Sequence, residues 1–152
     1  MTKEEYNQLD IHFAHCASNQ CEKANKCLRN IAHSMLVHNR HDFYSVINPS
    51  VIKGDQPCPH FILDYRETFA LGISHIYDKV QVTDLDNIRK NIIFNFGKSI
   101  YYRIKQQKRA ITEHEQQTIR NEFTEMGYDG NAIEFDRYEE KYPILMQLYK
   151  YN

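Results

Sequence analysis

The sequence has little glycine, little proline and no tryptophan. Its 152 residues include only five glycines and four prolines, too few for the glycine-rich loops that hold nucleotide phosphates, and neither a P-loop nor a GxGxxG pattern is present. No apolar run approaches the ~20 residues of a membrane-spanning helix. The first residues are polar and lack the apolar core of a signal peptide. We therefore expect a cytoplasmic protein without a membrane span.

The sequence also lacks the local motifs of several enzyme classes, including GxSxG and HExxH. Asp84 and Asp86 lie where a helix is expected to begin, and negative charge is favourable there without any catalytic role. A cysteine and a distant histidine can meet in a folded chain, but nothing in the pattern selects one of the eight histidines. We expect a non-catalytic protein with no small-molecule substrate.

The net charge is close to zero, but the charges are unevenly distributed. Nineteen Lys and Arg residues stand against twenty Asp and Glu residues. Residues 86–120 hold eight basic and three acidic side chains, whereas residues 121–152 hold three basic and seven acidic ones. A local positive field can bind phosphate even when the whole molecule is nearly neutral. The alternatives are a solvated helix face and an acidic segment that folds back on the basic one.

Length and apolar spacing predict a single, mainly α-helical domain over residues 1–152. The chain has the length of one domain, and 41% of its residues are hydrophobic. Apolar residues recur at helical spacing over 22–37, 61–80 and 83–96. We expect residues 43–60 to form a loop that contains a short strand at 44–47.

Capping signals predict where several helices begin and end. Thr2 and Thr112 are each followed three residues later by glutamate, which is the pattern of a capping box. Thr83 and Ser99 are further candidate N-caps. Gly97 and Gly127 are the expected helix stops. The tail helix is expected to start near Asp136, and Pro143 interrupts or restarts it.

The cysteines form the most specific pattern in the chain. Cys16, Cys21, Cys27 and Cys58 give the spacing C-x4-C-x5-C-x30-C. Disulfides are disfavoured in a reducing cytoplasm, and four thiolates satisfy a tetrahedral zinc ion and leave no open position. We predict a cysteine-rich metal knot within residues 1–60 that holds structural zinc, followed by a helical part over 61–152.

The cysteine spacing leaves alternatives open. An iron–sulfur cluster is one, because the first gap matches that of plant-type ferredoxins. His15 or His60, which lie beside Cys16 and Cys58, could each replace a thiol. Cysteines can also be small buried apolar residues, and Cys27 lies on the apolar stripe of its expected helix.

The basic segment resembles part of a helix-turn-helix domain. The run Phe96–Arg109, with Ile111–Ile119 after it, is similar to the recognition helix and following helix of Cro/λ-repressor-like domains. Ser99 occupies the capping position of that family and Ile104 the apolar anchor, with basic residues closing the helix. The candidate nucleic-acid-binding residues are Lys98, Ser99, Tyr101, Tyr102, Arg103, Lys105, Lys108 and Arg109.

Two features of the segment depart from that family. The preceding helix is bulky, and the glycine expected near the end of the recognition helix is Gln106 or Gln107. The resemblance implies contact with DNA or RNA through helix termini and cationic side chains. The alternatives are a surface helix whose tyrosines pack inward, and a basic stretch that meets an acidic protein partner.

Nearly the whole chain also resembles an uncharacterised family of small cysteine-containing proteins from gut anaerobes. The resemblance rests on His12-Phe13-Ala14-His15-Cys16 with Cys21 and Cys27, on Asn48-Pro49 with Cys58-Pro59, and on Tyr101-Tyr102-Arg103-Ile104 with Ile111-Thr112 and Glu115-Gln116. It implies one architecture for the cysteines and the basic segment, and no catalytic residue.

Taken together, the sequence predicts a small zinc-binding protein that contacts DNA or RNA through residues 98–109. The alternatives are a metal-stabilised protein-interaction module and an iron–sulfur or redox protein.

Overall fold

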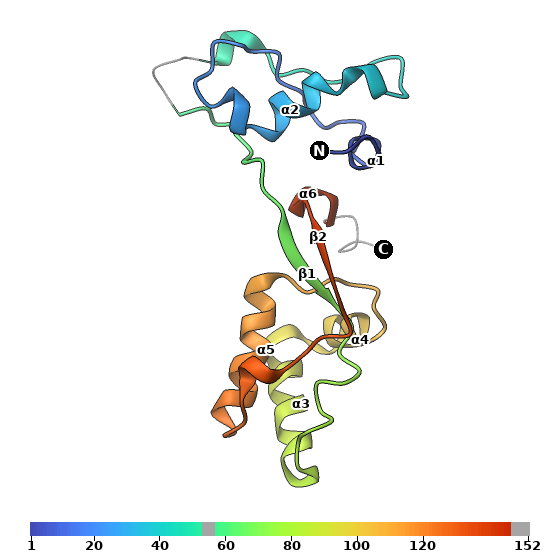
Figure 1. The fold of residues 1–152 in the computed structure, drawn as a ribbon, viewed down its shortest axis with the longest axis vertical. Coiled ribbons are helices and arrows are strands. Elements are labelled where there is room, and N and C mark those ends of the chain that lie inside the picture. Colours follow the sequence, from blue (N-terminus) through green and yellow to red (C-terminus); the bar gives the residue numbers. More distant parts are fainter. Residues whose placement is uncertain (53–56, 147–152) are drawn as a thin grey trace. The chain divides into compact units, whose positions relative to one another are not determined.

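Two units of unequal regularity make up the chain, Met1–Tyr65 and Arg66–Asn152 (Figure 1). We call them the N-terminal unit and the C-terminal unit. The computed structural model describes residues 1–52 and 57–146. The two units meet between Tyr65 and Arg66. In the described residues, no helix combines the length and the apolar character needed to cross a bilayer.

The N-terminal unit is mostly irregular chain with two short α-helices, α1 (Lys3–Tyr6) and α2 (Leu28–Ser34). The helix predicted over 22–37 is broken because Cys27 has an extended backbone (ψ 117°) and the backbone of Met35 lies outside the α-helical region. The capping box at Thr2 is confirmed by both of its hydrogen bonds. Single turns of 3₁₀ helix lie at Ala24–Lys26, Leu36–His38 and Pro49–Val51.

Two side chains of α2 hold the irregular segments of this unit together. The Arg29 guanidinium donates to the carbonyls of Ala14 (2.7 Å) and His60 (2.9 Å). The Asn30 amide donates to two carbonyls within segment 16–18. Because loops have few ladder bonds of their own, such side-chain bonds to backbone carbonyls supply the missing partners.

The C-terminal unit combines helices with a two-stranded sheet (Figure 1). The strands pair antiparallel, with Glu67 opposite Lys141 and Leu71 opposite Arg137. Ala70 also forms an isolated antiparallel bridge with Ile111. The regular elements are β1 (Glu67–Leu71), α3 (Val82–Phe96), α4 (Lys98–Lys105), α5 (Glu113–Glu125), β2 (Arg137–Lys141) and α6 (Pro143–Met146), with a 3₁₀ turn at Gly130–Ala132.

The prediction of a mainly α-helical fold is wrong, because the described chain is a mixed α/β structure. The segment 61–80 contains β1 in place of a helix, and β2 stands where the tail helix was expected; Pro143 begins α6. Both faces of β1 are buried at its second half: Phe69 and Leu71 belong to one apolar cluster, and Ala70 belongs to the main core, whereas Thr68 is exposed. These three consecutive buried residues show no polar alternation, so the sequence pattern there did not indicate a strand.

The main core of the C-terminal unit lies among β1, the three longer helices and the segment before β2. Helices α3 and α5 pack side by side (Figure 1). The largest fully buried side chains of this core are Ile88, Ile92, Ile104, Ile111, Ile119 and Phe123.

The predicted helix ends in this unit are partly confirmed. Gly97 (φ +80°) and Gly127 (φ +85°) adopt the left-handed backbone and follow the ends of α3 and α5. Thr112 forms the predicted capping box. Thr83 is not a cap, because α3 begins at Val82, and Ser99 lies inside the first turn of α4.

Tyr128, which follows the end of α5, bonds to the start of α3, where no side-chain cap is present. The Tyr128 hydroxyl accepts from the Gln81 N–H (3.1 Å) and donates to the Asp84 carboxylate (2.7 Å). It therefore satisfies one of the donors that a helix N-terminus leaves unpaired. The hydrogen bond to Asp84 raises the pKa of Tyr128.

Candidate functional site

The predicted metal knot does not form. In the described residues, which include all four cysteines, no three His, Cys, Asp or Glu side chains lie where they could hold a metal ion together. All four thiols are free; Cys16 and Cys27 are buried, and Cys21 and Cys58 are half-buried. Zinc or an iron–sulfur cluster stays a prediction from spacing alone.

The buried cysteines fill places in the packing of the N-terminal unit. The Cys16 N–H donates to the Arg29 carbonyl (3.1 Å). Cys27 precedes α2 and forms an isolated antiparallel bridge with Leu63. Both are 7% exposed, which is common for thiols that act as small apolar residues.

Residues 98–109 lie on α4 and the turn after it, and their side chains form an inward and an outward set. Tyr101, Ile104 and Arg109 are buried, and Arg103 is half-buried. The tyrosine hydroxyls of residues 77 and 101 lie 3.3 Å apart beneath the helix. The exposed predicted residues are Lys98, Ser99, Tyr102, Lys105 and Lys108.

Arg109 forms a bidentate ion pair inside the turn between α4 and α5. Its two terminal nitrogens donate to the two Glu115 oxygens at 3.2 and 2.6 Å. One of these oxygens also accepts from the Thr112 N–H (3.0 Å) as part of the capping box. The arginine side chain is only 10% exposed, so it positions the start of α5.

The outward side of α4 and the turn after it carry four exposed side chains, three of them cationic, that we call the lysine face: Lys98, Tyr102, Lys105 and Lys108. The first three are spaced i, i+4 and i+7, which places them on one side of a helix. In the part of the chain that the structure describes, the ammonium groups of the three lysines form no hydrogen bond or ion pair. Tyr102 is 45% exposed and meets Tyr101 edge-on at 5.4 Å between ring centroids.

The connections around α4 differ from those of a helix-turn-helix motif. Only Gly97 separates α3 from α4, whereas the motif has a turn of about three to four residues. After α4, Gln107 has φ +57°, the left-handed backbone that glycine adopts most easily. The helix-turn-helix resemblance stays a prediction.

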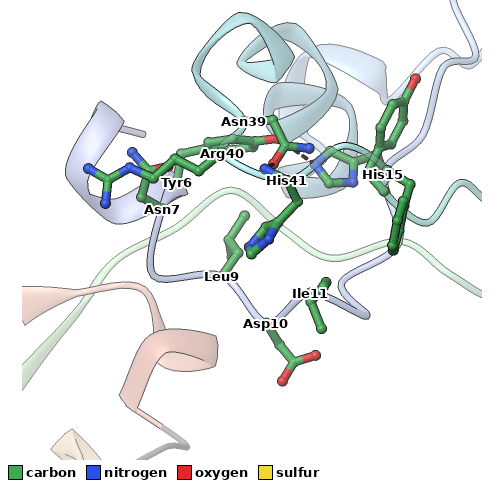
Figure 2. Close-up of a pocket in the computed structure, with 11 residues that line it drawn as sticks. Tyr6, Asn7, Leu9, Asp10, Ile11, His15, Asn39, Arg40 and His41 are labelled. Carbon is green, nitrogen blue, oxygen red and sulfur yellow. Dashed lines mark hydrogen bonds between the residues drawn. The ribbon is translucent and has the colours of Figure 1, made fainter.

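The N-terminal unit contains a pocket that the sequence analysis did not identify (Figure 2). Its volume is about 240 Å³, and segments 6–15 and 39–44 surround it. Arg40 and His41 are polar groups of its lining, and Leu9 and Ile11 are apolar ones. The remaining lining residues are Tyr6, Asn7, Asp10, His15, Asn39, Phe43 and Tyr44.

The wall of the pocket contains a buried tyrosine–histidine pair. Nδ1 of His15 lies 3.2 Å from the Ser45 carbonyl, and Nε2 lies 3.0 Å from the Tyr6 hydroxyl. Since a carbonyl only accepts, Nδ1 carries the proton of the neutral ring, and the Tyr6 hydroxyl donates to Nε2. Burial lowers the pKa of His15 and raises that of Tyr6, so both groups are neutral near pH ~7.

Backbone pairing between residues distant in sequence helps to bring the two segments of this pocket together. The His15 N–H donates to the Ser45 carbonyl (2.8 Å), and the Ile47 N–H donates to the His15 carbonyl (2.9 Å). The sequence analysis treated His15 as a substitute metal ligand, and no local pattern pointed to its pairing with Tyr6. Three aromatic rings meet the His15 ring edge-on, those of Tyr6, Phe13 and Tyr44, but they come from two separate segments of the sequence.

The comparisons with known proteins identify one family. The chain matches a family of unknown function, DUF6078, over residues 1–144. No curated protein and no solved structure matches the chain. The expected resemblance to a family without an assigned activity is therefore confirmed, while an origin in gut anaerobes stays a prediction.

Proposed function

We propose that this chain, which belongs to the DUF6078 family, binds nucleic acid through the phosphate groups that meet its lysine face. The supporting observation is that Lys98, Lys105 and Lys108 are exposed and form no ion pair within the described residues, while the neighbouring Arg109 is held by Glu115. Cationic side chains without protein partners are the ones that can replace counterions on a phosphate backbone.

The arrangement suits contact with successive phosphates. Lys98 and Lys105 are seven residues apart on α4, or ~10 Å along the helix axis, so each ammonium group would meet a different phosphate. The ring of Tyr102 lies between them and is partly exposed. An exposed aromatic ring beside cations can stack on an unpaired base. The proposal is therefore backbone binding with a preference for single strands.

Anisotropy of a labelled oligonucleotide tests the proposal directly. We expect a single strand to bind more tightly than the matching duplex. We expect the triple variant Lys98→Ala/Lys105→Ala/Lys108→Ala to lose most of this affinity. For this variant, the slope of log K against the logarithm of the salt concentration should become shallower by roughly 2, because each phosphate contact contributes about 0.7 to the slope on a single strand.

The matched control is Lys3→Ala/Lys26→Ala/Lys79→Ala, which removes three exposed lysines elsewhere and has the same net charge. Equal losses in the two triple variants would show that the net charge, and not the lysine face, governs binding. No binding by the intact protein at low salt would contradict the proposal outright.

An acidic protein partner is the competing outcome of the same experiment. Polyglutamate has the charge of such a partner but no phosphate and no base. If it displaces the oligonucleotide at equal charge concentration, the lysine face recognises acidic peptide and the nucleic-acid proposal fails. A reducing cytoplasm, in which free thiols persist, is the compartment that goes with the proposal.

A further inference from the structure

We propose that the pocket of the N-terminal unit binds a small organic monoanion, with a carboxylate directed at Arg40 and a flat apolar ring against the pocket walls. This site lies in a different unit from the lysine face and does not depend on the proposed function. Its lining combines one permanent cation with aliphatic and aromatic side chains (Figure 2).

The charges of the lining favour a single negative charge. Arg40 is exposed and forms no hydrogen bond or ion pair within the described residues. Its planar guanidinium presents paired donors that match a carboxylate. Asp10 is the acidic residue of the lining; one of its oxygens accepts from the His12 N–H (2.7 Å), and its carboxylate points away from Arg40 and His41 (Figure 2).

A dianion such as phosphate fits these charges less well. Arg40 supplies one full positive charge, and His41 adds another only when it is protonated. With Asp10 nearby, a second negative charge on the ligand would remain uncompensated. A carboxylate uses the one permanent cation, Arg40, and brings no second negative charge that would need a partner.

The walls favour a ring attached to the anion. Phe43 is 72% exposed, and Ile11 and Tyr44 are each 42% exposed, so an apolar ligand would cover surface that now faces water. The Tyr44 ring meets the His15 ring edge-on at 5.2 Å between centroids. His15 is itself fixed by two hydrogen bonds, so part of the wall is organised before a ligand enters. The volume of about 240 Å³ limits the occupant to a small molecule.

Benzoate is the probe, and benzamide is its neutral counterpart of nearly the same shape. Amide chemical shifts of the full chain, followed by NMR during a benzoate titration, should change in a saturable way within residues 6–15 and 39–44. Benzamide should bind about tenfold or more weakly, because a charge-assisted hydrogen bond contributes more than a neutral one.

Two variants with opposite effects make the test specific. Arg40→Gln should weaken benzoate binding about tenfold or more, and Asp10→Asn should strengthen it ~2-fold by removing a like charge. Lys26→Gln is the matched control, because this exposed lysine belongs to the same unit and does not line the pocket. The benzoate affinity of this variant should equal that of the wild type. Spectra without ligand show that each variant is folded.

Three outcomes would overturn the inference. They are an absence of shifts on benzoate addition, equal benzoate affinities of wild type and Arg40→Gln, and equal affinities for benzoate and benzamide. None of these bears on oligonucleotide binding by the lysine face.

Discussion

At the scale of single residues, the N-terminal unit depends on a histidine that is kept neutral. His15 is 6% exposed and uses both ring nitrogens. Burial lowers its pKa, and the hydrogen bond to Ser45 offsets part of this effect. Protonation would place a donor against the Tyr6 hydroxyl, which would have to rotate to accept.

The first prediction concerns this histidine. Because its pKa in the folded protein lies below the ordinary value of ~6.5, the unfolded chain binds more protons in the interval between the two values. The free energy of unfolding should therefore fall as the pH falls through ~6.5. An NMR titration of the His15 Cε1–H resonance, assigned by its loss in His15→Gln, should give a midpoint below ~6.5. A midpoint at or above that value would contradict the buried, neutral ring.

The second prediction separates two adjacent basic residues. Arg109→Ala should lower the free energy of unfolding by ~2–4 kcal/mol, because it leaves the mostly buried Glu115 carboxylate without its bidentate partner. Lys108→Ala should change it by less than ~0.5 kcal/mol, since this lysine is exposed. Urea unfolding measures both. Similar values for the two variants would show that the ion pair does not hold the turn.

At the scale of elements, Asp136 joins the start of β2 to the segment after β1. Its carboxylate accepts from the N–H and the hydroxyl of Ser74, both at 2.8 Å, and from the Gln107 amide at 3.2 Å. Gly72 lies directly against this carboxylate with φ +79°, and a Cβ there would collide with it. Glycine is therefore required twice over, for its backbone conformation and for the close approach.

The third prediction compares two glycines with nearly the same φ angle. Gly72→Ala should destabilise the C-terminal unit by ~3 kcal/mol or more, which combines left-handed strain with the displacement of Asp136. Gly97→Ala has φ +80° and ψ 149° but nothing within 4 Å of the new Cβ, so backbone strain alone should cost ~1–3 kcal/mol. Thermal unfolding of the two variants gives the difference. Equal losses of stability in the two variants would show that the contact with Asp136 does not contribute to the free energy of unfolding.

The elements that the sequence predicted well are those fixed by local chemistry. The capping boxes at Thr2 and Thr112 and the left-handed stops at Gly97 and Gly127 depend on residues within one turn. The strands were missed because their pairing is not local. β1 is buried on both faces at residues 69–71, and its partner β2 lies some seventy residues further along the chain.

At the scale of the whole molecule, the two units were predictable to different degrees. In the C-terminal unit, apolar spacing correctly located α3 and α5, and the charge count pointed to the exposed lysines around α4. In the N-terminal unit, the cysteine spacing suggested a metal site, but the side chains do not gather into one. Arg29 and Asn30 connect the loops there by donating to backbone carbonyls, and no sequence pattern predicts such bonds.

The pocket illustrates the same limit. Its lining comes from segments 6–15 and 39–44, which meet through the bridge between His15 and Val46. Before that pairing is known, Tyr6 and Arg40 are unrelated surface residues in the sequence. A single chain with no local motif at either segment could not reveal that they face one cavity.

The proposal that nucleic acid meets this protein at the lysine face is open to one decisive measurement, an amide chemical-shift map of the intact chain during titration with a short single-stranded oligonucleotide. We expect the largest changes within residues 98–108, and we expect them to be absent from the triple lysine variant. Changes that centre elsewhere, or an unchanged spectrum at low salt, would contradict it.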